Sequence, residues 1–218
     1  MASAAGEPVV LIAAPFLSLQ RPALGLSLLK AALAERGIAA RCEYLNLSFA
    51  EVITPELSQK IAQTMPSQHL IGDWVFAHLI RGAGADHDLA DGEDWVREKL
   101  KPEVAAQVIA ARTHACSFVA AAARTIVASK PRVVGFSTSF QQNCASLALA
   151  ARIKALNPEI LICFGGANCE DSMGRQMLRS FAQVDVAFSG EADKTFPDFV
   201  EHYLGAALPK DSPRFISG

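Results

Sequence analysis

The sequence lacks a strong charge of either sign. Its 218 residues include 20 basic and 22 acidic side chains, which give a formal net charge of -2. A protein that binds nucleic acid or an anionic membrane through charge usually carries a clear basic excess. We therefore expect neither a nucleic acid nor a membrane among the partners of this chain.

The sequence also lacks a cysteine framework, a targeting signal and a membrane-spanning run. Its five cysteines are odd in number and scattered, unlike the dense sets of small secreted domains. No apolar run reaches the roughly 18 residues that a transmembrane helix needs, and "MASAAGEPVV" has no basic region ahead of its apolar stretch. These features predict a cytoplasmic protein with buried or half-buried thiols.

The motifs of common nucleotide and metal sites are missing as well. The position for a G-x-G-x-x-G fingerprint after the first predicted strand holds Pro15 to Ser18, without glycine, and no phosphate-binding P-loop occurs. The acidic stretch "ADHDLADGED" lacks the register of a calcium loop, and the two cysteines Cys163 and Cys169 do not make a zinc or iron–sulfur set. We predict no metal site built by side chains of this chain.

What is present is an alternation of buried strands and helices. The run "PVVLIAAPF" is typical of a strand buried on both faces, and Pro22 to Arg36 predicts a helix with Leu24, Leu28, Leu29 and Leu33 on one stripe. Residues Arg41 to Leu45 return as a second strand. Further strands are predicted at Val133 to Ser137, Ile160 to Phe164 and Val184 to Phe188, with helices at Gln142 to Leu156, Asp171 to Ser180 and Lys194 to Leu204.

These elements predict a single α/β domain over residues 1–218, with a helical insertion at 49–129 between strands two and three. We expect a Rossmann-like or flavodoxin-like parallel sheet of five strands in the order 2-1-3-4-5. Ligands of such sheets bind beyond the carboxyl ends of the strands, at the point where the strand order reverses. The loops after strands one, three, four and five should therefore line one site.

Those four loops are polar but nearly uncharged. They read "PFLSLQRP", "STSFQQN", "GGAN" and "SGEAD". Hydroxyls, carboxamides and backbone N–H groups suit a large ligand that carries many amides and hydroxyls and little charge. The pair Gly165 and Gly166 would let the backbone approach such a ligand closely.

Five segments together resemble the N-terminal part of cobalamin-dependent radical SAM enzymes, in particular the group that matures ribosomally synthesised peptides (RiPPs). The segments are "PFLSLQRPALGLSLLKAALAERGI", "YLNLSFAE", "VVGFSTSFQQNCASLALAARIK", "FGGANCEDSMGRQML" and "VDVAFSGEADKTFPDFV". The resemblance implies a cobalamin-binding domain of an enzyme that methylates carbon in a peptide. The implied corrin contacts are Phe16, Ser18, Leu19, Arg21, Ser137, Thr138, Ser139, Phe140 and Gln141; the implied nucleotide-tail contacts are Gly165, Gly166, Ala167, Asn168, Ser189, Gly190 and Glu191.

The chain departs in one way from cobalamin mutases and methionine synthase, and in another from the radical SAM enzymes that it resembles. It has no D-x-H-x-x-G motif in the first loop, so the resemblance implies base-off cobalamin without a histidine ligand. It also has no C-x-x-x-C-x-x-C triad, so the [4Fe–4S] cluster, S-adenosylmethionine and the radical SAM barrel would belong to a parent enzyme. We expect this chain not to be catalytic alone.

Two other functions fit the residues. One is a cobalamin-free interaction module that binds a precursor peptide or a radical SAM barrel. The other is a small transferase with Cys144 or Cys169 as nucleophile, although the sequence shows no base beside either thiol.

Overall fold

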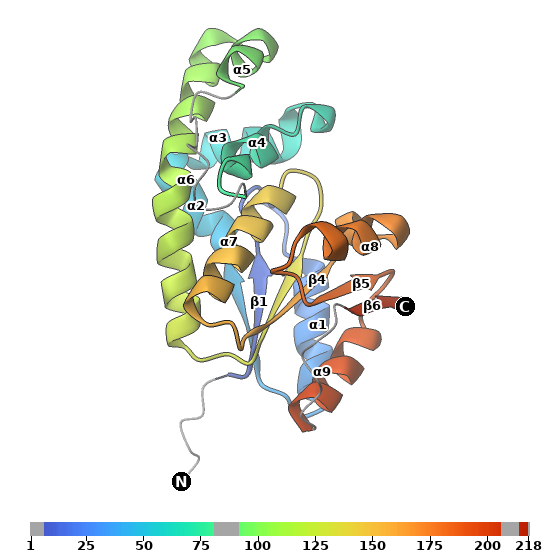
Figure 1. The fold of residues 1–218 in the computed structure, drawn as a ribbon. Helices are drawn as coiled ribbons and strands as arrows, with labels where there is room; N and C mark the ends of the chain where they lie inside the picture. The colour runs from blue at the N-terminus through green and yellow to red at the C-terminus, as the bar shows by residue number, and fades with distance from the viewer. Residues whose placement is uncertain (1–6, 81–91, 206–213, 218) are drawn as a thin grey trace.

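A parallel β-sheet forms the centre of the computed structural model, which describes residues 7–80, 92–205 and 214–217 (Figure 1). Neighbouring strands follow the order β2-β1-β3-β4-β5-β6, and every pair is parallel. The strands are β1 (Val9–Ala13), β2 (Ala40–Tyr44), β3 (Val133–Ser137), β4 (Leu161–Gly165), β5 (Val186–Ser189) and β6 (Arg214–Ser217). The α/β class and the parallel sheet predicted from the sequence are confirmed.

The prediction of five strands is wrong, because β6 adds a sixth at the edge beside β5. This strand has only four residues, "RFIS", of which the first three are half-buried. Such a short segment shows neither the continuous apolar run of a central strand nor a clear alternation. Its place is fixed by pairing with β5 rather than by its own pattern.

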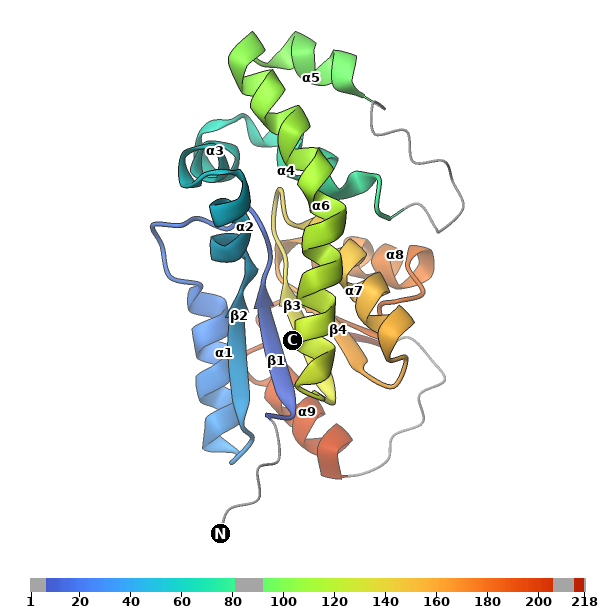
Figure 2. The same cartoon turned by 90° about the vertical axis from the view of Figure 1, so that its left-hand side faces the viewer.

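Alternate residues of the strands pack into two separate clusters, one on each face. In β1, Val10 and Ile12 face the cluster beneath α2 (Leu45–Ile53), α6 (Pro102–Ala128) and α7 (Asn143–Leu156). Leu11 and Ala13 face the smaller cluster beneath α1 (Leu24–Glu35) and α9 (Thr195–Gly205). Figure 2 shows α6 and α7 in front of the sheet and α1 and α9 behind it.

The predicted apolar stripe of α1 is partly wrong. Leu24 and Leu28 are 67% and 53% exposed, whereas Leu26 and Leu33 are buried. The face turned to the sheet is Leu26, Leu29 and Leu33, a spacing of three and four residues that is equally typical of a helix. Because α1 has leucine at five positions, more than one apolar stripe is possible from the sequence, and the packing against the sheet decides which leucines are buried.

The shorter helices of the insertion stand beyond the arrowheads of the strands, whereas the long helix α6 runs from there along the larger face of the sheet (Figure 1). The elements of the insertion are α2, α3 (Pro55–Gln59), the π-helical turn η1 (Lys60–Thr64), the 3₁₀ turn η2 (Ser67–His69), α4 (Ile71–Ala77), α5 (Glu93–Lys99) and α6. The chain becomes extended at Met65, before Pro66, because proline disfavours helical geometry in the residue that precedes it. The acidic loop predicted around Asp86 and His87 lies outside the described residues as far as residue 91, and its last residues, from Glu93 on, belong to helix α5 instead of a loop. Strand β2 precedes the insertion and strand β3 follows it, and both strands pair with β1.

Helix α6 is, within the described part of the chain, the one helix long and apolar enough to cross a membrane by length and composition. A single helix of this kind is a weak indication of a membrane span. Its buried residues, including Val108, Ala115 and Ile126, belong to the larger core cluster, and Arg112 is buried among them. The packing gives α6 a role in the core of the domain.

Helix α8 (Asp171–Ser180) covers the edge of the sheet near β5 and β6. Its bounds match the sequence-based prediction at both ends. Arg175 of this helix lies over the ring of Phe215 in β6, with 4.0 Å between the guanidinium carbon and the ring centroid. This cation–π contact helps to hold the short edge strand in place.

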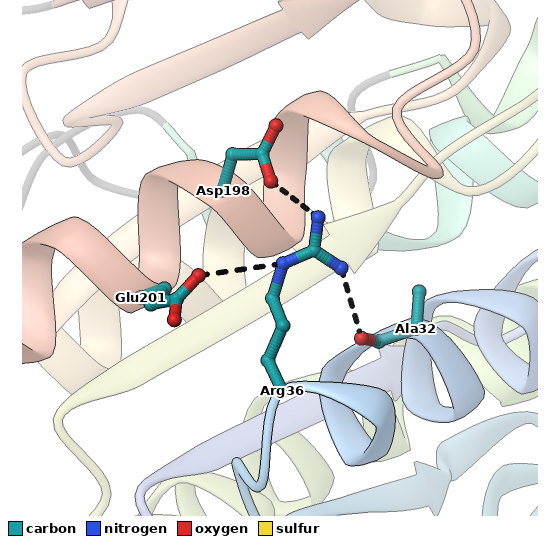
Figure 3. Close-up of polar contacts among 4 residues, drawn as sticks. All are labelled: Ala32, Arg36, Asp198 and Glu201. Carbon is teal, nitrogen blue, oxygen red and sulfur yellow. Dashed lines mark hydrogen bonds and ion pairs between the residues drawn. The ribbon is translucent and has the colours of Figure 1, made fainter.

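Helices α1 and α9 are tied together by Arg36, which follows the last turn of α1 (Figure 3). Its guanidinium forms an ion pair with Asp198 and a longer one with Glu201, at 3.5 Å from Nε to the carboxylate. The same group donates a hydrogen bond of 3.1 Å to the carbonyl of Ala32. One arginine thus bridges the two helices that cover the smaller face of the sheet.

We expect the Arg36 and Asp198 side chains to be energetically coupled. Because both carboxylates are largely exposed, solvent and salt screen the interaction, so the coupling should be about 0.2–1 kcal/mol. Urea unfolding of wild type, Arg36→Ala, Asp198→Ala and the double variant measures it. Additive single effects, or a coupling that does not shrink at high salt, would contradict the assignment.

Candidate functional site

A row of small residues crosses the face of the sheet that α1 and α9 cover. The register sets Gly135 of β3 opposite Cys163 of β4, and one step nearer the carboxyl edge it sets Ser137 opposite Gly165. Because none of these four side chains is large, the helices above them cannot close the space down to the sheet. The result is a hollow of about 300 Å³ at the carboxyl edge.

We call this space the apolar hollow. Its volume falls at the lower end of the range for small-molecule sites, and its walls are mainly leucine and phenylalanine. Polar groups occur at its rim, where Ser137, Glu191 and Asp193 lie. It is lined by Leu11, Gly25, Leu26, Leu28, Leu29, Gly135, Phe136, Ser137, Cys163, Phe164, Gly165, Gly166, Phe188, Gly190, Glu191, Ala192, Asp193 and Phe196. Such a space suits a flat apolar group whose polar atoms remain at the mouth.

A second space, the polar hollow, lies between the loops after β1 and β3 and the turn η1 of the insertion. It has a volume of about 520 Å³. Its walls mix hydroxyls, two carboxamides, a guanidinium and aromatic rings. It is lined by Phe16, Leu17, Ser18, Arg21, Pro22, Ile61, Ala62, Gln63, Met65, Ser67, Ser139, Phe140 and Gln141.

Two residues on the wall of the polar hollow have a strained backbone. Phe16 and Gln141 have φ angles of +70° and +73°, a region that residues other than glycine seldom adopt. Such a conformation costs about 1–3 kcal/mol and persists only when the surrounding structure enforces it. Here the two strained residues come from different loops and lie against the same helix, α4.

Helix α4 holds both loops through two consecutive residues. The N–H of Gly72 donates a 2.6 Å hydrogen bond to Oε1 of Gln141, and an added Cβ at Gly72 would lie 2.6 Å from the Phe16 ring. The carboxylate of Asp73 accepts the N–H of Cys144 at 2.7 Å, in the first turn of α7, and backbone N–H groups of Gln141 and Asn143 also donate to it. The insertion is therefore bonded directly to the carboxyl edge of the sheet.

Burial raises the pKa of Asp73 above its ordinary value near 3.8, although the N–H groups that it accepts act in the opposite direction. Burial also raises the pKa of the neighbouring Cys144 thiol, and the Asp73 carboxylate raises it further. The pKa of Cys169 is raised to about 12, again mainly by burial. Since only a thiolate is a strong nucleophile, these two thiols are poorly suited to the transferase role considered from the sequence.

The sixteen residues implied by the resemblance fall into three groups. The polar hollow is lined by Phe16, Ser18, Arg21, Ser139, Phe140 and Gln141. The apolar hollow is lined by Ser137, Gly165, Gly166, Gly190 and Glu191. Neither hollow is lined by Leu19, Thr138, Ala167, Asn168 or Ser189.

Most members of the third group hold the loops in place. The Leu19 N–H donates to Oε1 of Gln59 in α3 at 2.9 Å, and the Asn168 carboxamide donates to the carbonyl of Ser139 at 2.8 Å. The hydroxyl of Thr138 donates to the carbonyl of Gly165 at 3.3 Å, and that of Ser189 accepts the N–H of Asp171 at 3.0 Å. The single site expected from the sequence is thus two hollows, one on each side of the loop after β3.

Sequence reasoning missed the apolar walls of the first hollow. The signal for them is a glycine in the middle of an apolar strand, Gly135, where an added Cβ would lie 3.0 Å from Leu11 and 3.4 Å from Phe196. A glycine inside a strand often marks the close approach of another group. The floor of the hollow becomes visible only when Gly135 is set beside Cys163 by the strand register.

Within the described residues, no three His, Cys, Asp or Glu side chains lie close enough together to hold a metal ion. No family model matches the chain, and neither a curated protein nor a solved structure matches it. The fold and the two hollows define an open parallel α/β protein with space for a ligand at its carboxyl edge. The resemblance to cobalamin-dependent radical SAM enzymes stays a prediction.

Replacement by alanine should lower the stability of the protein at Gly166 but leave it almost unchanged at Gly165. A Cβ at Gly166 would lie 2.5 Å from the Thr138 carbonyl oxygen, and its φ is +89°, whereas a Cβ at Gly165 would make ordinary contacts of 3.7 Å and more. We expect Gly166→Ala to lower the free energy of unfolding by about 1–3 kcal/mol. Gly165→Ala should change it by less than about 0.5 kcal/mol. Equal effects in urea unfolding would show that the close approach of the loops is misplaced.

The buried carboxylate of Asp73 predicts a pH dependence. Because its folded pKa is raised, the charged form costs stability, and the folded state takes up the proton first as the pH falls toward 3.8. Between about pH 7 and pH 4, the free energy of unfolding of the wild type should therefore rise relative to that of Asp73→Asn. Urea unfolding at several pH values measures this difference, and a difference that stays constant or falls argues against a desolvated carboxylate.

Proposed function

We propose that this chain is the cobalamin-binding domain of a radical SAM enzyme, with a Rossmann-like fold of the flavodoxin type. The parent enzyme would be a peptide C-methyltransferase of RiPP maturation, and the chain alone would not be catalytic. The observation that carries the proposal is the pair of hollows, one apolar and one polar, on the two sides of a single strand-end loop. Cobalamin combines a flat apolar base with a ring that bears amide arms, so it needs both kinds of surface.

The apolar hollow fits the base of the nucleotide tail. Gly135 and Gly165 add no side chains to its floor; the ring of Phe196 lies against Gly135, and Phe188 of the neighbouring strand β5 lies beside Gly165. Burial of an aromatic group against such walls removes apolar area from water, at about 25 cal/mol per Å². The carboxylate of Glu191 and the hydroxyl of Ser137, at the rim, would meet the polar part of the tail.

The polar hollow fits the amide arms of the corrin. Hydroxyls of Ser18 and Ser139 and the carboxamide of Gln141 offer donors and acceptors, and Arg21 adds donors from the exposed rim. The inserted turn η1 closes one side through Ile61, Gln63 and Met65. These residues would bind and orient the ring and keep water from its edge.

Neither hollow is lined by a histidine among the described residues. With its base in the apolar hollow, bound cobalamin would be base-off, and the described residues that line the two hollows would offer it no histidine ligand. When bound, it supplies methyl transfer to a substrate radical, with S-adenosylmethionine and a [4Fe–4S] cluster held by the parent enzyme. The proposal includes a cytoplasmic location, and a radical SAM barrel and a precursor peptide as partners.

One observation favours the alternative of a cobalamin-free interaction module. Phe140, on the wall of the polar hollow, is 64% exposed. An exposed aromatic side chain at a loop tip is suited to anchoring a protein or peptide partner. In this alternative the polar hollow receives a side chain of the partner.

Cobalamin binding separates the two functions. The purified chain is mixed with hydroxocobalamin and desalted, and its visible spectrum is recorded. We expect near-stoichiometric retention with a base-off spectrum. A folded but colourless protein, judged by circular dichroism, would reject cobalamin binding by this chain and favour the interaction module.

Gly25→Phe tests the place of the tail. Gly25 lies at the mouth of the apolar hollow with no atom within 4 Å of an added Cβ, so phenylalanine should fill the hollow without disturbing the fold. We expect at least about tenfold weaker cobalamin binding. The control is Ala31→Phe, an exposed position of the same helix that does not line the hollow. Equal affinity of the two variants would place the tail elsewhere.

A further inference from the structure

Gln141 is a buried residue on the wall of the polar hollow, and its side chain has a hydrogen-bond donor without an acceptor. Its side chain is 3% exposed, and its Nε2 atom has no hydrogen-bond partner among the described residues. Buried donors are nearly always paired, so an unpaired one at the wall of a hollow points to a missing acceptor. The same residue has the left-handed φ of +73°.

The orientation of the Gln141 carboxamide is set by α4. The N–H of Gly72 points at Oε1, at 2.6 Å. If the carboxamide were turned over, its NH₂ group would face this N–H, and two donors would oppose each other. The oxygen therefore faces Gly72, and the NH₂ group is left for another partner.

The position of Gln141 is set by α4 as well. Its backbone N–H donates to the Asp73 carboxylate, and its Cβ and carbonyl oxygen lie 2.8 Å from the place where a Gly72 side chain would begin. Any side chain at Gly72 would displace Gln141 and the Phe16 ring together. Residues 72 and 73 of the insertion thus act as positioning residues for a group on the sheet edge.

We propose that Gln141 is a specificity-determining residue that donates its Nε2 hydrogens to a neutral carbonyl oxygen of the ligand, and that α4 holds it in place for this. The inference rests on the proposed function, in which the acceptor is an amide arm of the corrin. It adds that the insertion, although remote in sequence, sets the affinity of the ring. Because Oε1 of Gln141 is already bonded to Gly72, its side chain can only donate to a ligand. It therefore favours a ligand that presents an amide oxygen and cannot bind a group that has only N–H donors.

The experiment compares two corrins on four proteins. Hydroxocobalamin carries the nucleotide tail, and dicyanocobinamide lacks it, so the second probes the ring end alone. Dissociation constants are measured by absorbance titration for wild type, Gln141→Glu, Gln20→Glu and Gly25→Phe. Gln141→Glu keeps the acceptor for Gly72 and removes the donor, whereas Gln20→Glu places the same charge on an exposed residue of the loop after β1 that lines neither hollow.

We expect Gln141→Glu to weaken the binding of both corrins by about tenfold or more, because a buried donor is replaced by an acceptor. Gln20→Glu should stay within about twofold of the wild type for both. Gly25→Phe should weaken only hydroxocobalamin. If Gln141→Glu does not fold, as judged by circular dichroism, Gln141→Met takes its place, with the same loss expected.

Each other outcome rejects a definite part of the proposal. Wild-type affinity of the Gln141 variant, or an equal loss in Gln20→Glu, overturns the role of Gln141 and leaves the proposed function standing. A wild-type protein that binds neither corrin overturns the proposed function, and the corrin acceptor with it.

Discussion

The close approach of the loops after β3 and β4 is the constraint on which both hollows depend. The N–H of Thr138 donates to the carbonyl of Gly165 at 2.8 Å, and the N–H of Asn168 reaches back to the carbonyl of Thr138 at 3.4 Å. Gly166 fits between them only because it has no side chain and can adopt a positive φ. These bonds turn two loops into one partition, with the apolar hollow on one side and the polar hollow on the other.

The insertion belongs to this edge of the sheet rather than forming a separate unit. Gln59 of α3 accepts the N–H of Leu19 in the loop after β1. Gly72 and Asp73 of α4 form hydrogen bonds with the loop after β3 and with the first turn of α7. In addition, Phe16 of the first loop makes edge contacts with Phe49 of α2 and Phe76 of α4, at 5.7 and 6.1 Å between ring centroids. Three helices of the insertion, α2, α3 and α4, therefore help to determine the conformation of loops that, by topology alone, belong to the sheet.

The sequence carried enough information for those parts of the fold that depend on local pattern. The buried runs of β1, β3 and β4 and the bounds of α8 follow from apolar patterning and turn residues, and the structure places them within a residue or two of the prediction. Strand β6 was missed because "RFIS" has no pattern of its own. The stripe of α1 was misassigned because five of its positions are leucine.

The candidate site was harder to predict, for a physical reason. The apolar hollow arises where Gly135 and Cys163 become neighbours through strand pairing. The hydrogen bond that holds the Gln141 side chain comes from Gly72, which is 69 positions away in the sequence. Neither relation leaves a local trace in the sequence. The sequence does predict that the polar loops at the strand ends gather at one edge of the sheet. It does not predict the hydrogen bonds between the loops after β3 and β4, and these bonds separate the two hollows.

The ion pairs of Arg36 join α1 and α9 at a point remote from the apolar hollow (Figure 3). The arginine follows the end of α1, whereas Gly25 and Leu28, which line the hollow, lie in its first two turns. A guest that enters between the helices therefore meets the beginning of α1 and leaves these ion pairs in place. Since the pairs are exposed, their contribution is about 0.2–1 kcal/mol, so a small separation of the helices near the hollow would cost little at the joined end.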